Sequence, residues 1–529
     1  MKRTIFTVIT LLLSYCFMYA QISTNEEPIS FRTNIPTLRG NNNTLKTMPL
    51  LDMEKIQQED KEDEAKRVPP RFGYKHAVNY NLENSGEWIN LPSGDRIWRL
   101  AITCSDALSI NLLYDKFWLP DGAKFFIYSS DRAHRIGAFT SANNKGDRNN
   151  VRGFATGLVR SDQITLEYYE PNDVEHSGII SIAYVVHGYR NILLSNNEQS
   201  GRGYGDAGSC SININCPEGN DWQKEKNAVA MIVVDGCRWG AGALINTTAN
   251  DYRPLFLTAE FCVAVSGYTV TFHPNLDDYL FYWHYESPDC ISTSEPSFIS
   301  TSGAMIVAMS NIRAGDFALL QLTEDPKNIS GITPYYLGWD RSGNAGMGGV
   351  GIHHAIGDIK KISLYTTTPL STDSFSNSVD TTADYWRVIW NSGAEFGSAA
   401  SAGAPLINSN RKVIGLLQWG FAGCDAPTYP YWCSKLSKAW TGHGTNQTRL
   451  SSWLDPNNTN VMVLDGRCLP ENFNEDVYLA NRNFENDCGD INAQGAKVRN
   501  GKRLTLKAAG SVKIPSNFRV ELGSSLRIQ

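Results

Sequence analysis

The chain has 529 residues, more than a single hydrophobic core usually serves, and this length predicts about two to four domains. Its 44 glycines, 23 tyrosines and 21 phenylalanines favour β structure with many turns. The formal net charge of −6 is small for this length, so the composition gives no reason to expect a nucleic-acid partner.

Residues 1–20 have the pattern of a cleavable secretory signal peptide. Lys2 and Arg3 precede an apolar run that ends at Ala20, and we expect the mature chain to begin near Gln21. No later apolar run approaches the roughly 20 residues that a membrane span requires. We therefore expect a soluble, exported protein in which disulfide bonds are the usual state of cysteine. No CxxC pair indicates a metal site, and we expect no cofactor.

Residues 21–68 form a polar segment whose run EKIQQEDKEDEAKR is almost entirely charged residues, Gln and Ala. This composition predicts a polar linker, either mobile or containing a short exposed helix. From 69 to 195 the pattern changes to short β-branched and aromatic segments such as RIWRLAI and QITLEYYEP, separated by turns such as PSGD and LPDG. These segments predict an antiparallel β domain of sandwich type.

Two further β regions follow. SNNEQSGRGYGDAGS, at 195–209, is rich in Gly, Ser and Asn and separates the first β domain from residues 207–465, where strand and turn spacing resumes. Residues 469–529 end in two similar pieces, AGSVKI and LGSSLRI, set 13 residues apart. This repetition predicts a small stack of β arcs. The last 40 residues are locally basic, which suggests attraction to an anionic cell surface.

The central region resembles the lysyl-endopeptidase-like branch of the chymotrypsin-fold serine proteases. The resemblance rests on blocks that follow one another in order: SCSININCPEGNDW, NAVAMIVV, GALINTT, PLFLTA, FYWHYESPDC, GDFALLQL, GIHHAIGDIKKIS, GAPLINSNRKVIGLLQWG and RLSSWLDPNNT. The flanking regions resemble the N-terminal segment and the C-terminal β-stack module of similar secreted bacterial proteins. The resemblance implies an all-β protein whose central domain is a double β-barrel, located outside the cell, on its surface or in the periplasm.

The family's chemistry needs a serine nucleophile, a histidine base, an orienting carboxylate and oxyanion-binding N–H groups. The histidine of the T-A-x-H-C motif falls at Phe261 in TAEFC, and a phenyl ring cannot accept a proton. Alignment on Gly403-Ala404-Pro405 places Ala402 where the serine belongs. Asp316 matches the carboxylate, and without a histidine we expect it to be a buried structural residue.

Two further positions depart from the family pattern. The oxyanion glycine falls at Ala400, unless 398–400 is an insertion. The aspartate that selects lysine in the specificity pocket falls at Tyr431, so a preference for lysine is not supported.

The resemblance implies disulfides between Cys210 and Cys424 and between Cys216 and Cys290. The usual partner position of Cys262 is Gly240, and the nearest candidate is Cys237. Because an odd shift along a strand reverses the side-chain face, a Cys237–Cys262 bond would need a turn or bulge to close. The remaining cysteines, Cys104, Cys433, Cys468 and Cys488, have no implied partners.

Other residues invite functional interpretations. His353-His354 with Asp358 suggests a metal site or a replacement base. However, the same sequence motif occurs in an ordinary strand and turn of the family, so we expect a structural role. Glu260 is a poor substitute base because neighbouring strand residues face opposite sides.

The leading hypothesis is a secreted serine protease homologue that has lost its catalytic residues and binds a peptide or protein in the former cleft. The first alternative is an active endopeptidase that uses Ser401 or Ser398 with His353 or His354. The second is a surface adhesion or structural protein whose β domains serve as spacers.

Overall fold

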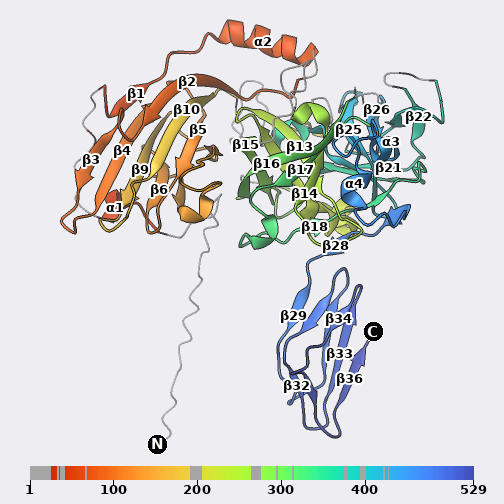
Figure 1. Ribbon diagram of the computed structural model, residues 1–529. Coiled ribbons are helices and arrows are strands. Elements are labelled where there is room, and N and C mark those ends of the chain that lie inside the picture. The colour runs from red at the N-terminus through yellow and green to blue at the C-terminus, as the bar shows by residue number, and fades with distance from the viewer. Residues whose placement is uncertain are drawn as a thin grey trace, which may run out of the picture.

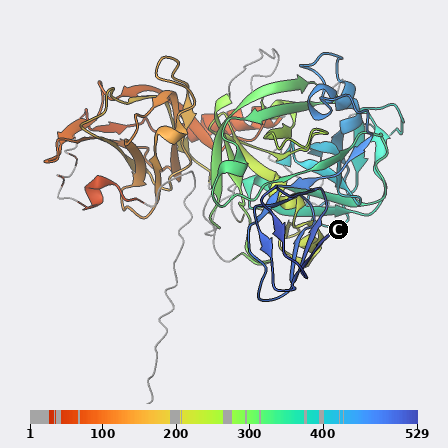
Figure 2. The same ribbon diagram turned by 60° about the horizontal axis from the view of Figure 1, so that its bottom comes forward.

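The computed structural model comprises an N-terminal domain, a central domain and a C-terminal module (Figures 1 and 2). The expected signal peptide at 1–20 lies outside the described residues. The structure describes residues 26–32, 35, 38, 42–65, 68–190, 205, 207–263, 276–292, 296–311, 315–373, 376, 378–393, 401–420, 423–426 and 428–529.

The N-terminal domain is a sandwich of two β-sheets. One sheet has the order β1-β4-β9-β6-β7, with β3 also paired to β4, and the other has the order β2-β10-β5-β8. Ile164, Leu166 and Tyr168 alternate along β9 and all face the core between the sheets. The strands are β1 (Leu45–Thr47), β2 (Gly73–Asn81), β3 (Glu87–Asn90), β4 (Arg96–Thr103), β5 (Ser109–Trp118), β6 (Lys124–Ser129), β7 (Arg135–Phe139), β8 (Phe154–Ala155), β9 (Gln163–Glu170) and β10 (Ile179–Gly188).

The central domain begins with a closed six-stranded barrel of order β12-β13-β14-β17-β16-β15. Its first strand is apolar throughout because both of its faces are buried. Ile232 and Val234 point into the barrel, whereas Met231 and Val233 point outward against the N-terminal domain. The strands are β12 (Val229–Val234), β13 (Arg238–Leu244), β14 (Leu255–Thr258), β15 (Leu276–Trp283), β16 (Ile299–Ser310) and β17 (Phe317–Leu322).

The second half of the central domain is built on a ten-stranded sheet. Its path is β11-β21-β20-β24-β25-β26-β23-β22; β19 pairs with β25, and β27 pairs with β19. Two short helices, α3 (Leu436–Thr441) and α4 (Ser451–Leu454), follow it. The strands are β11 (Ile212–Asn213), β19 (Gly338–Asp340), β20 (Gly349–His353), β21 (Lys361–Tyr365), β22 (Leu370–Thr372), β23 (Tyr385–Val388), β24 (Pro405–Asn408), β25 (Lys412–Gly420), β26 (Tyr431–Lys435) and β27 (Val463–Leu464).

The C-terminal module is a stack of parallel coils. Its strands pair in parallel, and in the sheet that joins Arg482 with Leu504 and Arg503 with Ser525 equivalent positions are 22 residues apart. The two pieces set 13 residues apart in the sequence belong to different sheets of the last coil and do not stack on each other. The strands are β29 (Glu471–Phe473), β30 (Arg482–Asn486), β31 (Ile491–Ala493), β32 (Lys497–Val498), β33 (Arg503–Ala508), β34 (Val512–Lys513), β35 (Arg519–Val520) and β36 (Ser525–Ile528), and β28 (Arg467–Cys468) joins the module to β18 (Tyr335–Tyr336).

Helices contribute little to the fold. A single turn, α1 (Ile29–Arg32), precedes β1, and α2 (Met53–Ala65) occupies most of the charged run in the expected linker. None of the helices in the described parts of the chain is long and apolar enough to cross a membrane. The prediction of an all-β protein is confirmed.

Three disulfide bonds are present among the described residues. Two are the pairs that the sequence resemblance implies, and the third joins Cys468 to Cys488 in the C-terminal module. Cys104, Cys237, Cys262 and Cys433 are buried free thiols.

Candidate functional site

The segment after β14 carries the residue at the expected base position. The strand ends at Thr258, and a single 3₁₀ turn over Glu260–Cys262 follows it. Phe261 is half-buried and packs against the core of the first barrel. Its ring therefore serves as a packing group and supplies no atom that could accept a proton.

The residue at the expected nucleophile position lies directly against this segment. Ala402 is fully buried, and its carbonyl accepts a hydrogen bond from the backbone of Ala241 at 3.0 Å. The thiol of Cys262 lies 3.5 Å from the same carbonyl oxygen. The structure thus brings the segments of Phe261 and Ala402 together, although the two residues are far apart in the sequence.

Gly403 makes this close approach possible. Its φ is +84°, and a β-carbon on it would lie 2.1 Å from Thr258 Oγ1 and 2.3 Å from the carbonyl oxygen of Ala241. Only glycine fits such a position. The requirement is steric and holds whether or not the neighbouring residue is a nucleophile.

Asp316 is buried at the start of β17, as expected for a structural residue. Its carboxylate accepts a hydrogen bond from the hydroxyl of Tyr385 at 3.3 Å, and its backbone carbonyl accepts one from Gln418 at 2.8 Å. Neither partner could be predicted from the sequence, because both lie on strands of the second half of the domain. Burial raises the pKa of the Cys262 thiol to about 12, and the nearby negative charge of Asp316 adds a smaller upward effect. The thiol stays protonated and is not a nucleophile.

A buried histidine–serine pair lies next to Ala402. His353 Nδ1 is 2.9 Å from Ser401 Oγ, and His353 Nε2 is 3.0 Å from Ser363 Oγ. Ser363 donates its hydroxyl proton to the carbonyl of Gly393, which leaves its oxygen to accept from Nε2–H. Nδ1 then accepts the Ser401 hydroxyl. Burial lowers the pKa of His353 well below its usual value, so the ring is neutral.

This pair has the contact that the alternative proteolytic site would need, but it is not open to solvent. Both His353 and Ser401 are completely buried. A substrate carbonyl cannot reach the Ser401 oxygen while the two side chains stay buried. The neighbouring residues Ser398 and Ala400 lie outside the described residues.

The second histidine and its aspartate also have partners within the fold. His354 Nδ1 donates to the carbonyl of Asp358 at 2.9 Å, and the carboxylate of Asp358 pairs with Lys361 at 3.0 Å. Burial, together with the charge of Lys360, lowers the pKa of His354 to about 3. Within the described ranges, no group of three or more His, Cys, Asp or Glu side chains is placed to hold a metal ion.

The remaining two candidates are enclosed side chains. Tyr431, at the expected specificity position, begins β26 and is fully buried in an aromatic and aliphatic cluster with Trp390 and Leu417. Burial raises its pKa well above the usual value, so it presents no anionic group. Burial also raises the pKa of Glu260.

The expected bond between Cys237 and Cys262 is absent, because the two side chains lie on opposite faces of the barrel wall. Cys262 faces the barrel interior, where a β-carbon on Gly240 would lie 2.9 Å from its sulfur. Cys237 lies at the β12–β13 hairpin and packs on the outer face, against the N-terminal domain. The prediction of this disulfide is wrong because no bulge turns Cys237 inward.

Comparison with known proteins bears on residues 204–432, which match the family model of the lysyl endopeptidase C-terminal domain. The central domain is serine protease-like. The match covers less than half of the chain, so the flanking parts of the protein lie outside it.

The chain is also similar to solved structures at low identity. The crystal structure of Deg5 is 16% identical, covering 41% of this chain and 87% of that chain, with a TM-score of 0.27. The active form of a protease from M. tuberculosis is 13% identical over 47% of this chain and 91% of that chain, with a TM-score of 0.27. The serine endoprotease from Yersinia pestis is 11% identical over 40% of this chain and 60% of that chain, with a TM-score of 0.26. No conclusion about activity follows from similarities this low.

Proposed function

We propose that the protein is an exported serine protease homologue that has lost its catalytic histidine and serine and binds peptides or proteins without cleaving them. The observation that carries this proposal is the pairing of Phe261 and Ala402 in adjoining segments. One side chain has no lone pair and the other has no hydroxyl. Loss of triad members costs about 10⁴-fold or more in turnover, so only weak residual activity is expected.

The binding role rests on the surroundings of these two positions. Gly403 keeps its left-handed conformation, and Asp316 stays held between the two halves of the domain. A domain that keeps this framework can present strand edges to an extended peptide. The disulfides and the family of the central domain support a location outside the cytoplasm, in the medium, on the cell surface or in the periplasm.

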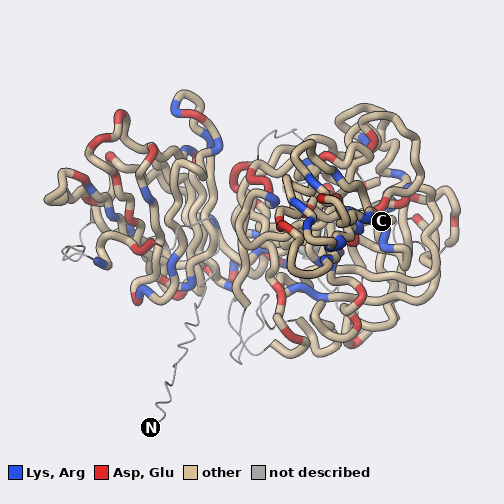
Figure 3. Tube along the Cα trace, turned by 90° about the horizontal axis from the view of Figure 1, so that it is seen from below, with Lys and Arg blue, Asp and Glu red and all other residues tan. Residues whose placement is uncertain are grey.

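Association of the C-terminal module with an anionic cell surface is a weaker part of the proposal. Lys and Arg positions gather on this module, as Figure 3 shows from below. However, Arg499 pairs with Asp476 and with Glu521, and Lys507 pairs with Glu485. These ion pairs offset part of the local positive charge.

A hydrolysis assay tests the main proposal. The mature protein, Phe261→His, Ala402→Ser and the double variant are incubated with a mixed peptide library, and cleavage is followed by mass spectrometry. We expect at most trace cleavage by the parent and by either single variant, and efficient cleavage only by the double variant. Uncleaved peptides that stay bound to the parent protein would support the binding role. Cleavage by the parent, abolished by a serine-directed inhibitor, would refute the proposal.

The contact between His353 and Ser401 favours a second candidate, an endopeptidase that uses these unaligned residues. That candidate predicts that a fluorophosphonate probe labels the parent and that Ser401→Ala removes the label. Because both side chains are completely buried, we expect no label on either protein.

A further inference from the structure

We propose that the N-terminal domain is a permanent, non-covalently held partner of the first barrel, and that the two stay together after the chain between residues 190 and 205 is cut. This inference concerns the flank of the protease-like domain and is independent of its catalytic state. It rests on three sets of contacts: a backbone junction, a shared apolar core and an acidic helix that binds both sides.

The backbone junction lies at residues 70–72, which pair with the start of β13. The amide of Phe72 donates to the carbonyl of Cys237 at 2.8 Å, and the amide of Trp239 donates to the carbonyl of Pro70 at 3.1 Å. The carbonyl of Phe72 in turn accepts from the amide of Tyr189, at the end of the N-terminal domain, at 3.1 Å. One peptide segment is therefore bonded to both units.

An apolar core is shared across the same junction. The rings of Phe72 and Trp239 stack with their centroids 4.1 Å apart. Leu113 of β5 packs on Gly236 at the hairpin, where a β-carbon would lie 2.5 Å from its methyl group. A core of this kind is typical of permanent interfaces rather than transient ones. Its members from the N-terminal domain are Phe72, Leu113, Ala155, Leu158 and Val186, and those from the central domain include Met231, Val233, Trp239, Leu280 and Tyr282.

Polar contacts surround this core. Lys75 pairs with Asp235 at 2.6 Å, and Arg152 pairs with Asp277 at 2.6 Å. The buried side chain of Asn111 donates to the carbonyl of Gly236 at 3.0 Å. Each pair joins one residue of the N-terminal domain to one of the first barrel.

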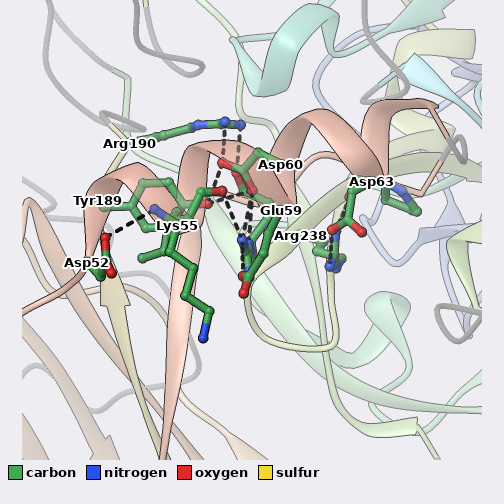
Figure 4. A network of polar contacts seen from close by, with 11 residues as sticks. Asp52, Lys55, Glu59, Asp60, Asp63, Tyr189, Arg190 and Arg238 are labelled. Carbon is green, nitrogen blue, oxygen red and sulfur yellow. Dashed lines mark hydrogen bonds and ion pairs between the residues drawn. The ribbon is translucent and has the colours of Figure 1, made fainter.

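Helix α2 closes the junction with acidic side chains that point to both units (Figure 4). Asp60, whose side chain is only 8% exposed, accepts hydrogen bonds from Arg71 at 3.0 Å and from Tyr189 at 2.9 Å, and it also pairs with Arg190. One turn later, Asp63 accepts a hydrogen bond from Arg238 of β13 at 2.7 Å. Removing one member of such an enclosed charge pair leaves the other unpaired, which is costly.

The test uses the full chain with the recognition sequence of a specific protease in place of residues 195–201. After complete cutting, gel filtration is run at about 0.1 M and about 1 M NaCl, because high salt screens exposed charges but not an apolar core. We expect the two fragments to elute together at the position of the uncut protein in both salts. Elution as two separate species would overturn the proposal.

The role of α2 is tested in the cut protein by exchange of a fluorophore-labelled N-terminal fragment. We expect Asp63→Asn, which removes the contact of α2 with Arg238 of the barrel, to speed dissociation about ten-fold or more. Glu54→Gln, which removes one charge from an exposed position of the same helix, should leave the rate unchanged. Arg238→Gln removes the same contact from the barrel side. It keeps the test available if Asp63→Asn fails to fold, as judged by circular dichroism of the uncut chain. Equal rates for these variants and the Glu54→Gln control would overturn the role of α2.

Discussion

Some residues near the former catalytic positions are required for packing, independently of any catalytic role. Gly403 is required because a β-carbon would collide with Thr258 and with Ala241, and this holds with alanine at 402 as it would with serine. Phe261 packs against the barrel core. A domain of this kind can therefore lose the proton acceptor and the hydroxyl without losing the hydrogen bonds that hold its segments together.

Glu286 gives a prediction about pH at the residue scale. Lys226 lies 2.6 Å from its carboxylate, and the fully buried Lys360 lies 3.0 Å from it. Burial alone would raise the pKa of Glu286, but the two positive charges outweigh it and lower the pKa to about 2, from 4.5. Since the folded pKa lies below the unfolded one, the stabilisation is complete above pH 4.5 and is lost as the pH falls towards 2.

We expect the free energy of unfolding to fall by up to about 3 kcal/mol across this window, because each pKa unit corresponds to about 1.4 kcal/mol. Urea denaturation between pH 2 and 7 would measure it. Glu286→Gln should be less stable at pH 7 and should lack this part of the pH dependence, whereas Glu218→Gln, at an exposed position, should retain it. If Glu286→Gln lost as much unfolding free energy as the parent between pH 4.5 and 2, Glu286 would not be the group responsible.

At the scale of strands and helices, local patterns in the sequence were informative, but they did not fix which strands lie together. The alternation in QITLEYYEP predicts β9 because every second residue faces one core. The 13-residue similarity in the tail does not predict the stacking, since stacked positions are 20 to 22 residues apart and the similar pieces lie on different sheets. The charged run at 54–67 gave no sign of its partners, because Arg190 and Arg238 are distant in sequence.

Strand β13 and the turn that follows β14 lie close enough for a disulfide to be introduced between them. A β-carbon on Gly240 would lie 3.5 Å from Cys262 Cβ, at the short end of the range of about 3.5–4.5 Å found in disulfides. We expect Gly240→Cys to form this bond on oxidation and to raise the free energy of unfolding by about 3 kcal/mol, as closure of a loop of this length predicts. Differential scanning calorimetry with and without a reducing agent measures the gain.

Two variants control this prediction. Gly240→Ala places a methyl group against the sulfur of Cys262 with no bond to form, so it should be destabilised under both conditions. Gly240→Cys combined with Cys262→Ala should not respond to the reducing agent. The prediction fails if thiol titration of oxidised, denatured Gly240→Cys finds both cysteines free.

At the scale of the whole molecule, one sequence feature is consistent with packing of the N-terminal domain on the first barrel. The run NAVAMIVV has no polar face, whereas a barrel strand open to solvent would alternate. The outward side chains Met231 and Val233 are covered by the N-terminal domain. Neither this covering domain nor the contact of His353 with Ser401 could be deduced from spacing, because both depend on how distant strands fold together.

The shared core gives a prediction about cooperativity. Because the N-terminal domain and the first barrel bury one apolar cluster between them, we expect both to unfold in a single calorimetric transition. The C-terminal module has its own core, which contains Phe473, and should contribute a separate transition. Phe72→Ala should lower the stability of the first transition by about 3–5 kcal/mol, the usual cost of removing a buried phenyl ring.

Phe473→Ala is the matched control, since it removes an equally buried ring and should shift only the transition of the C-terminal module. Assignment of the transitions follows from repeating the scan on a chain that ends at residue 468. If Phe72→Ala instead split the first transition, leaving the barrel at its original temperature, the two units would be energetically independent. The ring of Phe72 stacks on Trp239 of the barrel and belongs to a core that also contains Val186 of the N-terminal domain. This argues against that outcome, because loss of the ring weakens the core on both sides.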